Sequence, residues 1–172
     1  MFDKHKPLEV LATAIAISLL TTSGAVASVG QVANQSIVES TPEIVAQNQD
    51  ALEYLQEGIK LYGEGKIEEA EAAFRQAIEL DPQLAQAHAN LGTVLANQNK
   101  MAEAILEFEE AVRLKPEMAF LHYQLGVALY MENRAKEAIN SLKEARDLLK
   151  EEGKTEQAEK IEEAIAKIEN ES

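Results

Sequence analysis

The sequence predicts an all-α protein in which three helical hairpins stack into a solenoid and one further helix closes the stack. Two observations lead to this prediction. Glycine recurs at the evenly spaced positions Gly58, Gly92 and Gly126. Around these glycines, apolar residues follow steps of three and four, which is the periodicity of a helix. Repeats of about 20–50 residues stack because a single unit cannot bury its own apolar face.

Composition excludes several classes of function. The 172 residues hold 16 Lys and Arg against 30 Asp and Glu, which gives a net charge of −14. Nucleic acids and anionic membrane surfaces would repel such a chain. The chain contains no Cys, which excludes disulfides, thiolate nucleophiles and metal sites built on Cys. Its apolar fraction of 46% is high enough for a packed core.

The first element is a predicted secretory signal peptide over residues 1–27. Lys4 and Lys6 precede an apolar run at 10–20, and Ala25-Val26-Ala27 offers small residues for cleavage before Ser28. A basic start, a short apolar run and an A-x-A site together are typical of such signals. The sequence therefore predicts an exported protein, located in a periplasm or a thylakoid lumen.

The alternative for this segment is an uncleaved membrane anchor. No charged residue occurs between Glu9 and Glu39, which is long enough to cross a bilayer. The second half of the segment, however, is rich in Thr, Ser, Gly and Ala, which gain little from lipid. Cleavage is therefore the favoured prediction, and the membrane is a partner only if the segment stays uncut.

The second element, residues 28–50, is predicted to be a linker. It is rich in Gln, Ser, Asn and Val, it contains Pro42, and it has no sustained period. We expect a loose connection between the signal peptide and the helical array.

The three repeat units are predicted at 51–84, 85–118 and 119–152. Gly63-Glu64-Gly65 and residues 97–100 interrupt the helical pattern within the first two units, while Pro82 and Pro116 end their second helices. A Gly inside a helix costs about 1 kcal/mol relative to Ala. The recurrence of Gly58 and its equivalents therefore indicates that the partner helix approaches closely at that position.

Several columns of residues recur with the same spacing. They are Tyr54/His88/His122, Glu57/Leu91/Leu125, Gly58/Gly92/Gly126, Leu61/Leu95/Leu129, Ala70/Ala104/Ala138, Phe74/Phe108/Leu142, Ala77/Ala111/Ala145 and Pro82/Pro116/Lys150. This pattern resembles the tetratricopeptide repeat (TPR) family. The departures are Glu57 in place of Leu, His in place of the first aromatic, and Lys150 in place of the third Pro. The resemblance implies a right-handed superhelix of helix-turn-helix units.

The last element, residues 153–172, is predicted to be a capping helix. Ala158, Ile161, Ile165 and Ile168 form one apolar stripe, and Gly153 separates them from the preceding helix. Repeat arrays need such a cap because the last unit would otherwise expose its stacking face. An extra binding helix is the alternative for this segment.

No catalytic site, metal site or cofactor is predicted. His88 and His122 share one column, and we interpret them as ring fillers between helices, because two His without Cys or fixed carboxylates make a poor metal site. The Gly63–Lys66 stretch lacks the spacing of a phosphate-binding loop, because Lys60 stands where the first Gly should be. We therefore expect a protein that is not an enzyme.

The resemblance also implies a binding site. In the TPR family the first helices of successive units line a concave groove that accepts peptides or protein segments. The positions expected to form this groove here are Leu52, Leu55, Ile59, Tyr62, Gln86, Asn90, Thr93, Asn97, Phe120, Tyr123, Val127 and Tyr130. The first and third units contribute mostly apolar residues, and the polar residues of the second can contact a peptide backbone.

The first functional hypothesis is therefore a protein-binding scaffold or assembly factor of the cell envelope, with an unidentified protein or peptide partner. A variant of the family clamps C-terminal carboxylates with Lys, Arg and Asn, but only Asn90 matches that set. Two alternatives remain at this point. The apolar faces of units one and three could mediate self-association into a homo-oligomer, or the protein could assist complex assembly in photosynthetic membranes.

Overall fold

The computed structural model describes residues 42–171, and side chains are described from Asn48 onward. The predicted signal peptide and most of the predicted linker lie outside the described residues. Within residues 42–171 the structure is entirely helical apart from turns. The helices are α2 (Pro42–Gly63), α3 (Ile67–Leu80), α4 (Ala85–Asn97), α5 (Met101–Leu114), α6 (Ala119–Met131), α7 (Ala135–Glu151) and α8 (Thr155–Glu171).

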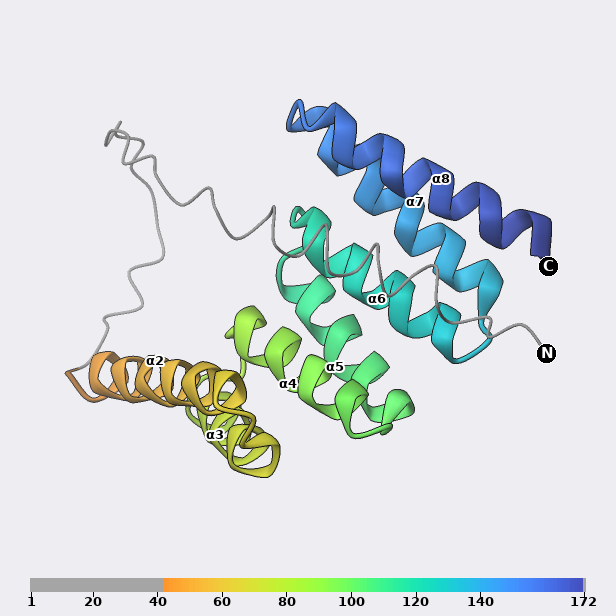
Figure 1. Ribbon diagram of the computed structural model, residues 1–172. Coiled ribbons are helices and arrows are strands. Elements are labelled where there is room, and N and C mark those ends of the chain that lie inside the picture. Colours follow the sequence, from red (N-terminus) through yellow and green to blue (C-terminus); the bar gives the residue numbers. More distant parts are fainter. Residues whose placement is uncertain (1–41, 172) are drawn as a thin grey trace, which may run out of the picture.

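The helices form three successive hairpins that stack side by side, and α8 lies along the last of them (Figure 1). Helices α2 and α3 form the first hairpin, α4 and α5 the second, and α6 and α7 the third. This arrangement is the all-α solenoid that the sequence predicted. None of the described helices is long and apolar enough to cross a membrane.

Close contact across each hairpin explains the recurring glycines. A Cβ added to Gly58 would lie 2.5 Å from the ring of Phe74, and one added to Gly92 would lie 2.8 Å from the ring of Phe108. At the third position, a Cβ on Gly126 would lie 2.8 Å from Leu142 Cγ. Such distances are too short for real carbon contacts, so only Gly allows the two helices of a hairpin to pack this tightly.

The turn inside each hairpin also repeats. Gly65, Asn99 and Asn133 occupy equivalent positions of the three units, and all three have a positive φ of 61–77°. Gly adopts this left-handed conformation without strain, and Asn is among the residues that tolerate it best. In each hairpin the next amide nitrogen then bonds back to the carbonyl of a core Leu, for example Lys100 N to Leu95 O at 2.9 Å. This bond closes the end of the first helix.

Helix α2 begins at Pro42 and so extends into the segment that the sequence assigned to the linker. Pro is favoured at the first helical position because its missing N–H would be unpaired there anyway. Once the packed part of α2 is formed, adding turns at its N-terminus needs no new nucleation. The lack of apolar periodicity in 42–50 therefore did not prevent helix formation.

Two large clusters of buried side chains hold the array together. The first runs from α2 to α7 and includes Phe74, Leu91, Leu95 and Phe108. The second joins α6, α7 and α8 and includes Tyr123. Since the clusters follow the stack rather than one centre, each hairpin packs against the hairpin or helix next to it.

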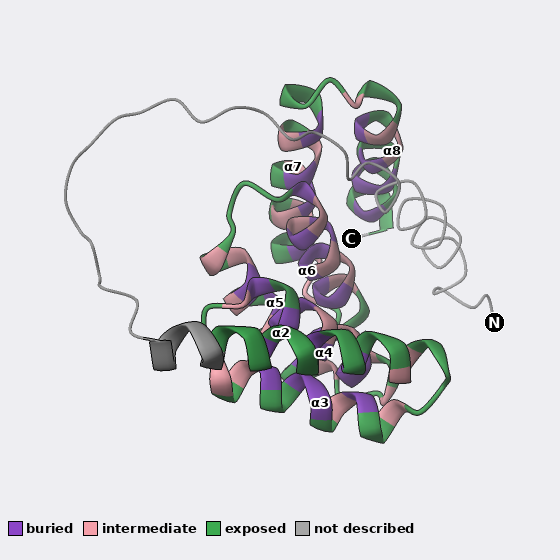
Figure 2. Cartoon of the chain, turned by 90° about the vertical axis from the view of Figure 1, so that its left-hand side faces the viewer, coloured by how far each residue is buried: buried purple, intermediate pink, exposed green. Residues whose placement is uncertain are grey.

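The outer side of α2 is polar. Glu53, Glu57 and Lys60 are exposed, and Figure 2 shows much of this helix as exposed surface. The equivalent residues of the second unit, Ala87, Leu91 and Val94, are buried in the first cluster. No described hairpin precedes α2, which gives a physical reason for Glu57 where the other units carry Leu.

Candidate partner-binding groove

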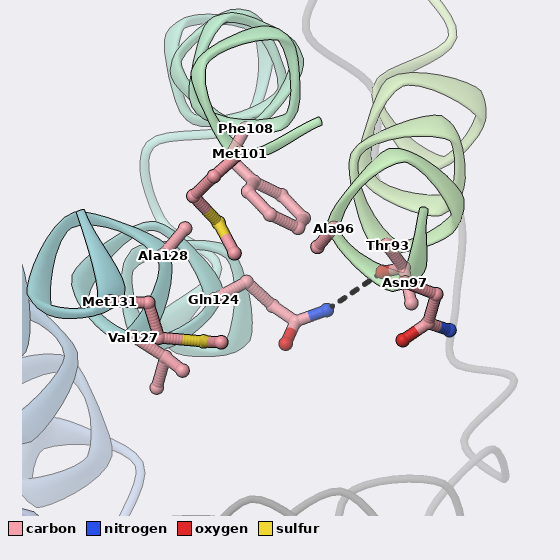
Figure 3. Close-up of a pocket in the computed structure, with 9 residues that line it drawn as sticks. All are labelled: Thr93, Ala96, Asn97, Met101, Phe108, Gln124, Val127, Ala128 and Met131. Carbon is pink, nitrogen blue, oxygen red and sulfur yellow. Dashed lines mark hydrogen bonds between the residues drawn. The ribbon is translucent and has the colours of Figure 1, made fainter. Parts of the chain in front are cut away.

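The inner face of the array is formed by the first helices of the hairpins. Gln86, Asn90, Thr93 and Asn97 follow steps of four, three and four, so they lie along one face of α4. Between this face and α6 there is a shallow hollow of about 90 Å³ (Figure 3). The residues that line it are Thr93, Ala96, Asn97, Met101, Phe108, Gln124, Val127, Ala128 and Met131.

Polar side chains bridge successive first helices across this face. Gln124 Nε2 of α6 donates a hydrogen bond to Thr93 Oγ1 of α4 at 3.1 Å, as drawn in Figure 3. Thr93 Oγ1 in turn donates to the Ala89 carbonyl at 3.0 Å. At the preceding junction, Asn97 Nδ2 of α4 donates to the Tyr62 hydroxyl of α2. The floor of the groove is thus a set of neutral hydrogen-bonding groups.

Asn90 differs from these residues. Its Nδ2 is out of contact with water and has no hydrogen-bond acceptor among the described residues. A buried donor without a partner costs about 1–3 kcal/mol. The residue lies on the same helix face as Gln86, Thr93 and Asn97, but its unpaired donor is buried.

The structure brings most of the predicted groove residues to this inner face or its border. Thr93, Asn97 and Val127 line the hollow. Leu52 and Ile59 of α2 are 47% and 44% exposed. Among the other predicted groove residues, those that are partly or fully exposed are Tyr62, Gln86, Asn90 and Phe120.

Two predicted groove residues are instead in the core, and this corrects the prediction. Leu55 is 5% exposed and belongs to the first cluster, where it packs with Ala87 and Leu91. Tyr123 is 2% exposed and packs with Ile161 and Ile165 of α8. Both residues face the next helix of the stack rather than the open groove. Burial raises the pKa of Tyr123 to about 12.

Tyr130 is also partly covered by the capping helix. Its ring packs against the second cluster, and its hydroxyl donates a hydrogen bond to Glu171 Oε2 at 2.8 Å. Together with Tyr123, it shows that α8 occupies part of the surface that the sequence assigned to a partner. The open groove is therefore narrower and more polar than expected.

The residues of the hollow that had not been assigned to the groove from sequence are Ala96, Met101, Phe108, Gln124 and Ala128. Met101 and Phe108 come from α5, behind the first helices, and reach the hollow between them. Gln124 is the equivalent of Asn90 in the next unit, so the repeat spacing was a usable signal for it. For the two α5 residues no such signal exists, because their columns are those of ordinary core positions.

His88 makes two hydrogen bonds at the back of α4. Its Nδ1 lies 2.7 Å from Glu107 Oε2 of α5, and its Nε2 lies 3.1 Å from the Pro82 carbonyl. Both partners are acceptors, so satisfying both requires a proton on each ring nitrogen. Burial by itself lowers the pKa of His88, but the bonds to Glu107 and Pro82 and the charges of Glu107 and Glu110 raise it above its ordinary value.

The second histidine of this column has a simpler environment. His122 Nε2 lies 2.9 Å from the Pro116 carbonyl, and that is its one hydrogen bond within the described part of the chain. The two histidines bond to different turns and do not meet. Among residues 48–171, no group of three or more His, Asp or Glu is arranged to hold a metal ion.

Charged side chains are paired away from the hollow. Glu71 of α3 accepts from Arg75 at 2.8 Å and from Lys100 at 3.2 Å, which links the first hairpin to the turn of the second. Arg146 of α7 donates to Glu162 of α8 at 2.7 Å. None of the residues that line the hollow carries a charge.

A family profile described as tetratricopeptide repeat matches residues 55–119. These residues span the first two hairpins, whose geometry is described above. Residues 55–119 therefore belong to the tetratricopeptide repeat family. This confirms the resemblance carried by the recurring columns. No curated protein matches the chain by sequence.

Solved structures with the same TPR fold are numerous. The TPR2B domain of yeast Sti1, in a complex with pHsp70, aligns with a TM-score of 0.67 at 21% identity, over 72% of this chain and 99% of that domain. The first TPR domain of Spaghetti (RPAP3), bound to the HSP90 peptide SRMEEVD, gives 0.64 at 22% identity, over 72% and 93%.

A bacterial protein shows the same likeness. The type III secretion translocator chaperone SycD of Yersinia enterocolitica aligns with a TM-score of 0.64 at 17% identity, over 69% of this chain and 83% of that one. At these identities the likeness establishes the TPR fold.

Proposed function

We propose that this protein is a non-enzymatic binding module that holds a segment of a partner protein in the groove between α2, α4 and α6. The observation that carries the proposal is the open inner face of α4 with the hollow beside it. Its neutral donors and acceptors lie beside apolar side chains, and convergent groups of this kind are typical of a recognition surface.

The fold supports this proposal by analogy. The Sti1 and Spaghetti domains were solved as complexes with pHsp70 and an HSP90 peptide. Those ligands are properties of those proteins, and the acidic SRMEEVD peptide would not suit the uncharged hollow found here. We infer a different partner, held in the corresponding region of the fold.

We further propose that the protein acts after export, as a scaffold or assembly factor of the cell envelope. The support for this part is the predicted signal peptide of residues 1–27. Fusion of those residues to a reporter that is active only outside the cytoplasm should give activity, and removal of the apolar run should abolish it.

Site-specific photo-crosslinking tests the groove. A benzophenone side chain placed at Gln86, which is exposed on the inner face of α4, should crosslink to one discrete protein segment in cells that express the chain. The control is the same group at Leu106, which is 64% exposed on α5. Equal crosslinking from both positions to the same protein would contradict the groove assignment.

Self-association is a second candidate, because Leu52 and Ile59 are large exposed apolar side chains on one helix. Sedimentation of the intact chain separates the two candidates. A monomer at all concentrations would leave the groove as the binding surface for another protein.

A further inference from the structure

Two of the side chains that line the hollow between α4 and α6 are thioethers. Met101 is the first residue of α5 and Met131 is the last of α6, and both reach into the hollow (Figure 3). The sequence has four Met, and the remaining two are Met1 and Met118. Met118 directly precedes α6 and takes no part in the lining. Half of the methionines of the chain are thus gathered at one small surface.

The described methionines differ in location and in exposure. Met131 is 43% exposed and Met118 is 44% exposed, whereas Met101 is half-buried. A small oxidant dissolved in water therefore reaches one Met in the hollow and one Met outside it with similar ease. For this reason Met118 is a matched control for Met131 within the same chain.

The oxidisable sulfur atoms of this chain are those of Met, because it has no Cys. In the reaction with hydrogen peroxide, a lone pair of the sulfur attacks one oxygen, so that a sulfur–oxygen bond forms and the oxygen–oxygen bond breaks. The sulfur is oxidised by two electrons and becomes a sulfoxide. The departing hydroxide takes the proton of the new S–OH group and becomes water.

We propose that Met131 is a reversible oxidation site, at which a peroxide converts the thioether to a sulfoxide and thereby closes the hollow to an apolar ligand group. Methionine sulfoxide reductases return the sulfoxide to the thioether, which makes the site reversible. The effect on binding rests on the proposed function, whereas the chemistry at the sulfur does not.

A sulfoxide changes the hollow in two ways. Met131 and Val127 belong to its apolar lining, and the sulfoxide replaces an apolar sulfur by a polar group with an acceptor oxygen. An apolar ligand group that covered this oxygen would take it out of water without offering a hydrogen bond. The amide of Gln124 lies in the same lining and already donates to Thr93 at 3.1 Å. The new oxygen competes with Thr93 for that donor.

The first experiment finds where the oxygen is added. The full-length chain is treated with dilute hydrogen peroxide, and tandem mass spectrometry follows the oxidation of each Met over time. Met131 and Met118 should react at similar rates, and Met101 should react more slowly because it is half-buried. A Met131 that stays a thioether after Met118 is fully oxidised would overturn the proposal.

The second experiment detects the change in the hollow without any ligand. NMR of the isotope-labelled full-length chain resolves the side-chain amide of Gln124. Peroxide should shift this resonance in the unaltered chain and in Met118→Leu, but not in the double variant Met101→Leu/Met131→Leu, in which Leu keeps a similar volume without sulfur. Treatment with the reductases should restore the original resonance. An unmoved resonance in a chain whose Met131 is fully oxidised would contradict the proposal.

The third experiment measures binding through the benzophenone at Gln86. The purified chain is oxidised, freed of peroxide and added to an extract of untreated cells, and the yield of the crosslinked partner segment is compared with that of the same chain before oxidation. The yield should fall about tenfold, which is the lower end of what one misfitted group costs in an apolar pocket.

Variants carrying the same benzophenone separate the hollow from other sites. Met118→Leu should lose yield on oxidation as the unaltered chain does, and Met101→Leu/Met131→Leu should not, whatever its yield before oxidation. An equal loss in the double variant would place the effect outside the hollow and overturn the proposal. If Gln86 crosslinks to no discrete segment even before oxidation, the proposed function fails, and the first two experiments still decide whether Met131 is an oxidation site.

Discussion

The two ends of the array solve the same problem by different means. Every solenoid unit has two stacking faces, so the first and last of the described units each have one face without a neighbouring unit among residues 42–171. At the start, Glu53, Glu57 and Lys60 make that face of α2 polar. At the end, the apolar face is kept, and α8 covers it with Ile161 and Ile165.

The difference has consequences for binding as well as for stability. Polar substitution at the first unit uses no additional chain and leaves the inner face of α2 open, with Leu52 and Ile59 exposed. Covering the last unit with α8 stabilises it but buries Tyr123 and part of Tyr130. The groove is therefore open at its first two helices and partly closed at the third.

The largest effect on stability is expected at the end of the array that α8 covers. Ile161→Ala removes a fully buried side chain from the α8 interface and should lower the free energy of unfolding by about 2–5 kcal/mol. Thermal denaturation followed by circular dichroism measures it. Leu106→Ala, an exposed position on α5, is the control and should change stability by less than about 0.5 kcal/mol. Equal effects at both positions would mean that α8 is not a structural cap.

A smaller effect on stability is expected from the protonation of His88, which lies inside the stack at the junction of the first two hairpins. Although burial lowers it, the pKa of His88 is raised in the folded state by the hydrogen bonds to Glu107 and Pro82. The contribution of these bonds to folding stability is therefore fully present at a pH below the pKa of an unfolded His, about 6.5. It is lost as the pH rises through the pKa of His88 in the folded protein. A hydrogen bond to a charged group contributes about 1.5–3 kcal/mol, which is the upper limit here.

The pH dependence is measured by chemical denaturation across the neutral range. His88→Gln should flatten the decline of stability above a pH of about 6.5. His122→Gln is the matched control, because His122 has one carbonyl acceptor and no carboxylate bonded to it among the described residues. If both variants change the profile equally, the second acceptor at His88 has no effect on its protonation.

The smallest effect on stability is expected at the polar end. Replacing Glu57 by Leu, the residue of the equivalent positions 91 and 125, should change the free energy of unfolding by about 0.5 kcal/mol or less, because the site is exposed. Combined with Lys60→Val, it should instead cause association that increases with protein concentration, since an apolar stacking face is then exposed. Sedimentation velocity measures this, with Gln76→Leu on α3 as the control for added apolar surface. A double variant that stays monomeric would show that charge at α2 is not what ends the stack.

The repeat itself could be predicted because the contacts and turns that require particular residues recur at a fixed spacing in the sequence. Gly58 and its equivalents contact a ring or a Leu of the facing helix, and both members of each pair recur once in every unit. Turn positions such as Asn99 recur in the same way. The capping helix was also predictable, since its Ile residues form a stripe of helical period.

The groove was predicted less well, for a geometric reason. Positions facing the next helix and positions facing the groove are neighbours on the same helix, and both can be apolar. Leu55 and Tyr123 therefore matched the pattern, but the packing of the following helix buries them. Tyr54 shares a column with His88 but is 37% exposed, whereas His88 is buried and bonds to the Pro82 carbonyl of the preceding turn.

The hydrogen bonds from Asn97 to Tyr62 and from Gln124 to Thr93 each join two consecutive first helices. They act on the inner surface, where the curvature of the superhelix is set. With these helices held in register, the spacing of the groove is fixed before any ligand arrives. A ligand then loses little free energy to reshaping its site, and its rate of capture is governed by diffusion and orientation. The same two bonds that define the floor therefore also hold the shape of the surface that a ligand meets.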